Sequence, residues 1–94
     1  MNITLQTLKF TETPQLRAFV EEKVSKLSQL NDRLIRIDVT LKTDSMNDTE
    51  NKCCELYVSL PGDNKFAKRN AATYEESIIK TVDVMEKILR RLKE

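Results

Sequence analysis

The chain has 94 residues, of which 39% are hydrophobic and 33% charged, and its formal net charge is +1. This size suits one small domain, and the composition excludes a chain that is disordered throughout. A net charge this close to zero also excludes a uniformly basic protein. Any nucleic-acid binding would therefore need cations gathered on one face.

The N-terminal part of the chain predicts a strand followed by a helix. Ile3 and Leu5 alternate with polar neighbours, which is typical of a short strand with one buried face. Thr13 and Pro14 predict a helix start, because Thr accepts hydrogen bonds from free amides and Pro suits the first helical position. We expect the helix to span about residues 14–30, with an apolar stripe along one side. The stripe is Leu16, Phe19, Val20, Val24, Leu27 and Leu30.

Residues 34–42 show the clearest strand pattern in the chain. Apolar and polar residues alternate there, which indicates one buried side and one side facing water. The residues expected to point inward are Ile35, Ile37, Val39 and Leu41. Residues 43–51 are polar and partly acidic, and they predict a loop.

Two further strands are predicted on either side of a turn. In the first, the expected inward residues are Cys54, Leu56, Val58 and Leu60, and the expected outward residues are Cys53, Glu55, Tyr57 and Ser59. Residues 61–64 combine Pro, Gly, Asp and Asn and predict the turn. A short strand follows over about residues 65–69. Its inward side is ambiguous, because Phe66 and Ala67 lie on opposite faces.

The last part of the chain predicts a second helix that runs to the C-terminus. Thr73 and Glu76 fit a capping box, in which the two side chains satisfy free backbone amides reciprocally. Apolar residues then recur at spacings of three and four, which is typical of a helix with one buried side. They are Ile78, Val82, Met85, Leu89 and Leu92.

These elements define an α+β fold in the order β-α-β-β-β-α. Both helices are amphipathic and the sheet has one apolar face, so the helices should pack side by side on that face of a four-stranded mixed sheet. The initial strand–helix–strand unit should place its two strands in parallel through a right-handed crossover. The later turns should make antiparallel neighbours.

The chain lacks the usual catalytic and metal-binding chemistry. It has no histidine, and the adjacent Cys53 and Cys54 do not make a zinc site without one. A single glycine cannot build a phosphate-binding loop. We therefore predict no enzymatic activity, no metal and no cofactor. No apolar run approaches the roughly 18–20 residues that span a bilayer, and no secretory signal is evident, so a cytoplasmic protein is expected.

The basic residues of the two predicted helices are the candidate binding residues. Most of those in the second helix project almost opposite its apolar stripe, at about 100° per residue, and Arg90 flanks them in the last turn. Those of the first helix lie at the margin of its stripe, and one follows the helix exit. Packed side by side, the helices would share a cationic surface suited to the phosphates of structured RNA. The candidates are Lys23, Lys26, Arg33, Lys80, Lys87, Arg90 and Arg91.

Other interpretations of these residues stay open. Basic residues in the last turn of a helix also complement its dipole, and a face rich in Lys and Glu is often simply solvated. Tyr57 on the exposed sheet face could stack on a base or merely cover the sheet. The alternative function is a small regulatory module that binds another protein through an exposed sheet edge, without binding RNA.

Several short motifs occur in a familiar order. They are VEEKVSKL at 20–27, DRLI at 32–35, LPG at 60–62, FAK at 66–68 and MEKILRRLK at 85–93. No single motif is very specific, but their colinear order covers nearly the whole chain. Because these motifs occur in this order, the chain resembles the ribosome hibernation-promoting factors, also called ribosome-associated inhibitors or sigma-factor modulation proteins.

The resemblance implies a fold like that of double-stranded-RNA-binding domains and docking on the small ribosomal subunit, over the decoding region. There the protein would silence translation by excluding messenger RNA and transfer RNA, as part of the stress response of stationary cells. The implied partners are the small subunit and its ribosomal RNA, with a protein that is monomeric when free. Residues 1–94 would form a single ribosome-binding domain, without the C-terminal dimerisation domain of longer members.

The resemblance carries over to individual residues only in part. The cations that match basic helix positions of the family are Lys23, Lys26, Lys87 and Arg91, whereas Lys80 and Arg90 are added from helical geometry. Gln29 and Val84 stand where many members have Lys, and Ile79 stands where an acidic residue is common. These departures predict a thinner basic surface.

Overall fold

The computed structural model describes residues 2–46 and 48–92, and its elements follow the predicted order β-α-β-β-β-α. No helix among these residues is long and apolar enough to cross a membrane. The elements are β1 (Asn2–Thr7), α1 (Pro14–Ser25), the 3-10 turn η1 (Lys26–Gln29), β2 (Arg36–Thr43), β3 (Lys52–Ser59), β4 (Lys65–Ala71) and α2 (Tyr74–Arg91).

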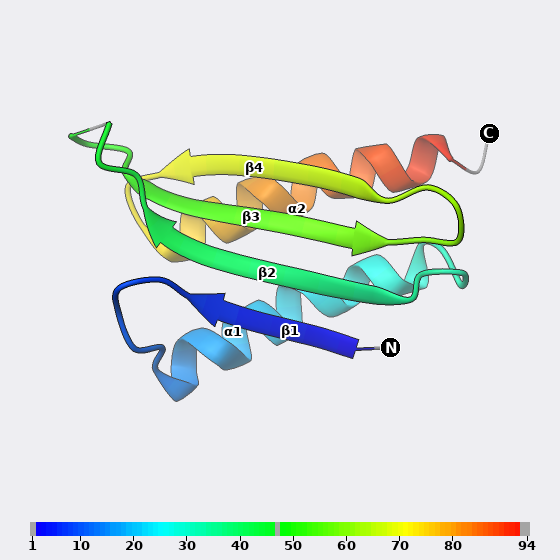
Figure 1. Ribbon diagram of the computed structural model, residues 1–94, viewed down its shortest axis with the longest axis horizontal. Helices are drawn as coiled ribbons and strands as arrows, with labels where there is room; N and C mark the ends of the chain where they lie inside the picture. Colours follow the sequence, from blue (N-terminus) through cyan, green and yellow to red (C-terminus); the bar gives the residue numbers. More distant parts are fainter. Residues whose placement is uncertain (1, 47, 93–94) are drawn as a thin grey trace.

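The four strands form one mixed sheet in the order β1-β2-β3-β4. β1 pairs with β2 in parallel, and the other two pairings are antiparallel, which confirms the prediction. Both helices lie on one face of this sheet and run in the same direction along it, while the other face carries no helix (Figure 1). The molecule is therefore a two-layer sandwich of a sheet and two helices.

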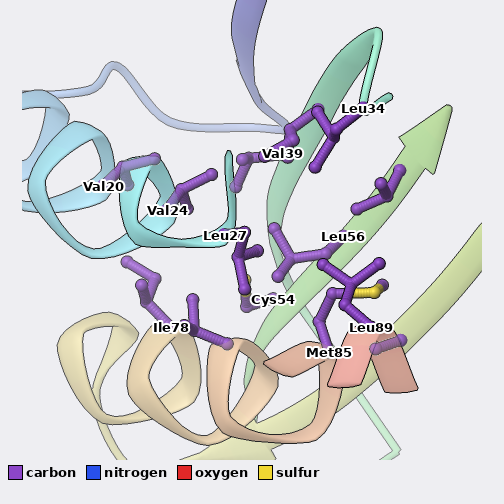
Figure 2. Packing of buried hydrophobic residues seen from close by; sticks show 14 of the residues in the cluster. Val20, Val24, Leu27, Leu34, Val39, Cys54, Leu56, Ile78, Met85 and Leu89 are labelled. Carbon is purple, nitrogen blue, oxygen red and sulfur yellow. The ribbon is translucent and has the colours of Figure 1, made fainter. Parts of the chain in front are cut away.

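The hydrophobic core fills the space between the sheet and the helices (Figure 2). Each fully buried aliphatic side chain in it contributes about 1.5–3 kcal/mol of transfer free energy, so the core dominates the stability of this small domain. From α1 and η1 it contains Val20, Val24 and Leu27, from the sheet chiefly Ile37, Val39, Leu41, Leu56 and Val58, and from α2 Ile78, Val82, Met85 and Leu89.

The two helices begin at the predicted caps. The Thr13 hydroxyl accepts a hydrogen bond from the amide of Leu16, and the Thr73 hydroxyl accepts one from the amide of Glu76, both at 3.1 Å. The reciprocal half of the predicted capping box is replaced by an ion pair. The carboxylate of Glu76 lies 3.2 Å from Nζ of Lys80, one turn further along α2.

The first helix is shorter than predicted. α1 ends at Ser25, and residues 26–29 form a 3-10 turn instead of continuing the α-helix to residue 30. The hydroxyls of Ser25 and Ser28 donate hydrogen bonds to backbone carbonyls three residues earlier, at 3.1 and 2.7 Å. Such local bonds offer the backbone an alternative to the regular helix. The tighter turn still buries Leu27.

The prediction that Ile35 points inward is wrong. Ile35 is 56% exposed, whereas Leu34 is only 9% exposed and joins the core. β2 begins at residue 36, and the preceding residues form a turn in which the amide of Leu34 donates to the carbonyl of Asn31 at 3.2 Å. Strand alternation therefore begins only after Ile35.

Cys53 takes the predicted outward position, but its side chain is fully buried. In the register Cys53 lies between Lys42 and Asn70, and these longer side chains flank the small thiol on the helix-free face. The structure also decides the ambiguous fourth strand. Ala67 faces the core and Phe66 faces away from it.

The second helix buries its predicted stripe except at its end. Leu92 is 40% exposed and lies one residue beyond α2. Two polar residues join the buried side, because the Thr81 hydroxyl donates to the carbonyl of Ser77 at 2.6 Å. This internal hydrogen bond removes the cost of burying the hydroxyl.

Candidate nucleic-acid interface

The cations of the first helix lie near its C-terminal end. Nζ of Lys23 sits 5.5 Å from the centroid of the Phe19 ring, a cation–π contact, and 4.0 Å from a carboxylate oxygen of Glu22. Lys26 begins η1 and is exposed, and it makes no ion pair with any described residue. Lys23 is therefore partly held in place, whereas Lys26 is free to contact a ligand.

The side of α1 that carries Lys23 can be located by first identifying what the opposite side of this helix borders. A shallow groove beside β1 is lined by Ala18, Glu21 and Ser25, so this flank of α1 borders the edge of the sheet. At about 100° per residue, Lys23 projects from the other flank. Because β1 is the edge strand and α2 packs on β3 and β4, that flank faces α2.

The cations of the second helix lie on its solvent side, as predicted. Lys80, Lys87, Arg90 and Arg91 are all exposed. Two of them are matched by acidic residues one turn earlier: Lys80 pairs with Glu76 at 3.2 Å, and Arg90 pairs with Glu86 at 2.7 Å. Neither Lys87 nor Arg91 has an ion-pair partner within residues 2–46 and 48–92.

Acidic residues share the outer surface with these cations. Glu76, Asp83 and Glu86 lie on the outer half of α2, and Glu22 lies on α1. The surface is therefore mixed rather than uniformly basic. Exposed ion pairs of this kind are worth at most about 1 kcal/mol, so phosphate groups can compete with the carboxylates for the same cations.

Arg33 lies at the same end of the molecule as the last turns of α2. Its backbone amide donates to the side chain of Asn31 at 2.9 Å, which fixes the turn between η1 and β2. Since α1 and α2 run in the same direction, this turn and the C-terminal part of α2 lie at one end (Figure 1), and η1 contacts α2 directly. We call Lys26, Arg33, Lys87 and Arg91 the basic end.

The structure thus divides the seven sequence candidates into two groups. The four residues of the basic end are exposed and have no ion pair with a described residue. Lys23, Lys80 and Arg90 are each engaged with a carboxylate. Lys93, the last residue of the C-terminal motif, lies outside the described residues. Spacing alone could not have indicated this division. Glu22–Lys26 and Asp83–Lys87 have the same i,i+4 spacing as the two pairs in α2, yet no ion pair joins them.

The described residues offer neither a metal-binding cluster nor a reactive thiol. Within the described residues, no group of three or more His, Cys, Asp or Glu side chains could hold a metal ion. Burial raises the pKa of the Cys54 thiol to about 12 and also raises the pKa of Cys53. Both thiols are therefore protonated at neutral pH and are poor nucleophiles.

A two-layer β-α-β-β-β-α sandwich with four exposed cations at one end defines a small α+β domain. Residues 3–94 match the family described as sigma 54 modulation protein / S30EA ribosomal protein, and the chain belongs to this family. The family assignment confirms the resemblance drawn from the motifs. Its members are ribosome-associated and not enzymes, as predicted for this chain.

Individual relatives agree with this assignment. A ribosome hibernation promotion factor from Deinococcus radiodurans is 33% identical over 82 residues, which are 86% of this chain and 43% of that protein. This chain thus spans less than half the length of that curated relative.

Two solved structures share the fold. A ribosomal subunit interface protein from Coxiella burnetii has a TM-score of 0.85 at 19% identity, covering 99% of this chain and 98% of that one. The N-terminal domain of Protein Y from Thermus thermophilus has a TM-score of 0.82 at 26% identity, covering 98% of this chain and 99% of that one. At 19% identity, the similarity to the Coxiella burnetii protein shows a shared fold and nothing further.

Proposed function

We propose that this chain is a ribosome hibernation factor that binds the small ribosomal subunit near the decoding region and acts in the cytoplasm. There it occludes the sites of messenger RNA and transfer RNA and so blocks translation. The observation that carries this proposal is the family match over residues 3–94, supported by a relative named for ribosome hibernation.

The basic end supplies the physical means of docking. Its four cations come from two chain segments held together by the packing of η1 against α2. When such cations approach ribosomal RNA they displace condensed counterions, which favours binding at low salt and weakens it steeply as salt rises. Inhibition then needs only steric exclusion, with no bond made or broken. The paired cations Lys23, Lys80 and Arg90 contribute after releasing their carboxylates.

Sedimentation of ribosomal subunits with purified protein tests the proposal. The wild-type chain should sediment with small subunits and inhibit cell-free translation. The double variant Lys87→Glu, Arg91→Glu should stay at the top of the gradient and leave translation unaffected, because it turns two attractive contacts into repulsive ones.

A matched control separates the basic end from net charge. Lys9 and Arg69 are exposed and have no ion pair with a described residue. Lys9 follows β1 and Arg69 lies near the end of β4, and both of these strands end away from the C-terminal part of α2 (Figure 1). Lys9→Glu with Arg69→Glu changes the charge equally and should retain binding. The proposal fails if wild-type protein does not sediment with small subunits, or if both double variants lose binding equally.

The second candidate function is a regulatory module that binds another protein. The open edge of β1 favours it, because among the described residues this strand pairs only with β2 and borders the groove lined by Glu21 and Glu22. An unpaired edge is a template for strand addition. Under this function, Lys87→Glu with Arg91→Glu would leave partner binding intact.

A further inference from the structure

The helix-free face of the sheet carries two exposed aromatic side chains next to each other. Tyr57 in β3 and Phe66 in β4 are direct partners in the antiparallel register. Their side chains are 40% and 53% exposed. The residues beside them in sequence, including Leu56 and Ala67, point into the core, so alternation puts both rings on the open face. Single exposed apolar residues are ordinary, but an adjacent aromatic pair forms a patch.

The turn after β3 holds the Tyr57 ring in place. The side-chain amide of Asn64 donates a hydrogen bond of 2.8 Å to the Tyr57 hydroxyl. The carbonyl oxygen of the same Asn64 side chain accepts a bond of 3.2 Å from the amide of Leu60. Gly62, with φ of 76°, allows the chain to reverse between them. A ring braced in this way loses little conformational entropy when a ligand binds, so the patch is preorganised.

Cations surround this aromatic pair, and their carboxylate neighbours are already engaged. Asp38, the register partner of Tyr57, pairs with Arg36 at 3.2 Å. Glu55 lies 2.9 Å from Nζ of Lys42 and 3.9 Å from Nζ of Lys68. One carboxylate is thus shared by two ammonium groups. Asp44 accepts a hydrogen bond of 2.9 Å from Asn70 on this side of the sheet and interacts with Lys42 and Lys68, so three cations face three carboxylates. Exposed ion pairs of this kind are weak, so phosphates can compete for the cations. Lys68 projects on the same side of β4 as the Phe66 ring, two residues away.

We infer that the open sheet face binds single-stranded nucleic acid, with bases stacked on Phe66 and Tyr57 and phosphates near Lys68 and Arg36. Every base has a π-face, so stacking on aromatic side chains requires no particular sequence. Exposed aromatics on a β-sheet are a known platform for unpaired bases. This surface lies on the opposite side of the sheet from α1 and α2 (Figure 1), so it is separate from the basic end and independent of the proposed function.

The charge pattern favours a nucleic acid over a protein at this surface. The centre of a protein–protein interface is depleted of charged residues. Here the two rings are surrounded by six charged side chains: Arg36, Asp38, Lys42, Asp44, Glu55 and Lys68. A polyanion with flat aromatic groups matches both features of the patch.

Phe66→Trp gives a direct readout, because the chain contains no tryptophan and the new side chain would be its only one. We expect the fluorescence of this variant to be quenched saturably by octauridylate and octaadenylate. Phe66→Leu keeps the apolar side chain but removes the π-face. It should weaken binding of the labelled octamers, measured by anisotropy, about 5- to 150-fold, the effect of losing one stacked base.

The helix-side variant serves as the matched control. Lys87→Glu with Arg91→Glu should leave octamer affinity within about twofold, while Phe66→Leu should leave sedimentation with small subunits unchanged. Failure of one proposal is thus distinguishable from failure of the other. The inference is overturned if neither octamer quenches Phe66→Trp, or if Phe66→Leu binds octamers as wild type does. An octamer affinity that depends on Lys87 and Arg91 instead of Phe66 also overturns it.

Discussion

The rings of Phe10 and Tyr74 stack with their centroids 4.8 Å apart and their planes 20° from parallel. Phe10 lies before α1, and Tyr74 is the first residue of α2, so this contact joins the starts of the two helices. The Tyr74 hydroxyl also lies 3.1 Å from the hydroxyl of Thr43 at the end of β2. These contacts fix both helices against the sheet, and thereby set where their other ends place the basic end.

Removing the Phe10 ring should loosen this arrangement. Because the ring is partly buried, we expect Phe10→Ala to lower the free energy of unfolding by about 1–3 kcal/mol. For a domain of this size, each kcal/mol corresponds to a Tm decrease of about 4–8 °C in thermal unfolding followed by circular dichroism. Tyr74→Phe keeps the ring and loses only the hydroxyl, so it should cost less than about 1.5 kcal/mol. A larger loss for Tyr74→Phe than for Phe10→Ala would contradict this assignment.

Adjacent substitutions at the start of β2 test which side chain enters the core. Leu34 is 9% exposed and Ile35 is 56% exposed. Leu34→Ala should lower the free energy of unfolding by about 2–5 kcal/mol in urea titrations, because it leaves a cavity. Ile35→Ala should change it by less than about 1 kcal/mol, as expected at an exposed position. A larger loss of stability for Ile35→Ala than for Leu34→Ala would contradict the structure and support the inward Ile35 expected from the sequence.

Removing a carboxylate that neutralises a cation should strengthen ribosome association. In Glu86→Gln the guanidinium of Arg90 loses its 2.7 Å partner and becomes available to phosphate. We expect affinity for small subunits to rise several-fold at low salt, and the slope of log affinity against log salt to steepen by about one. Glu75→Gln removes a charge from the same helix at a residue that pairs with no described cation, and it should have a smaller effect. If Glu86→Gln and Glu75→Gln raised the affinity equally, the gain would come from the change in net charge and not from the release of Arg90.

Stability should fall at alkaline pH because of Cys54. Burial raises the pKa of this thiol from its ordinary value of 9.0 to about 12. The folded protein therefore holds the proton more tightly than the unfolded chain. The associated stability is fully present below pH 9 and is lost as pH rises from about 9 towards 12.

Comparison with Cys54→Ala isolates this contribution from other alkaline titrations. The wild-type free energy of unfolding should decline with pH faster than that of the variant, by up to about 1.4 kcal/mol per pH unit. Chemical denaturation at several pH values between 8 and about 11 measures both slopes. Parallel pH profiles would show that the thiol does not titrate differently in the two states.

Much of the fold is encoded in local patterns. Thr13 and Thr73 cap the helices because a short side-chain oxygen can reach a free amide in any fold. The alternation from Ile37 to Leu41 and the spacing from Ile78 to Leu89 identify buried faces, because strand and helix periods are fixed by backbone geometry. The strand order and the placement of both helices on one face follow from burying these faces together.

Some of the remaining differences arise where neighbours distant in sequence decide. Cys53 has an outward position in its strand, yet side chains from the two adjacent strands shield it. At Ile35 the cause is local, because the turn closed by Asn31 and Leu34 ends just before it and places Leu34 in the core. The sequence by itself determined the elements, the buried stripes and the list of candidate cations. Only the tertiary structure decided which cations gather at one end, because their proximity depends on how η1 and α2 pack. It also decided which of several equally spaced pairs within the helices form, because Asp83 and Lys87 have the same spacing as Glu86 and Arg90.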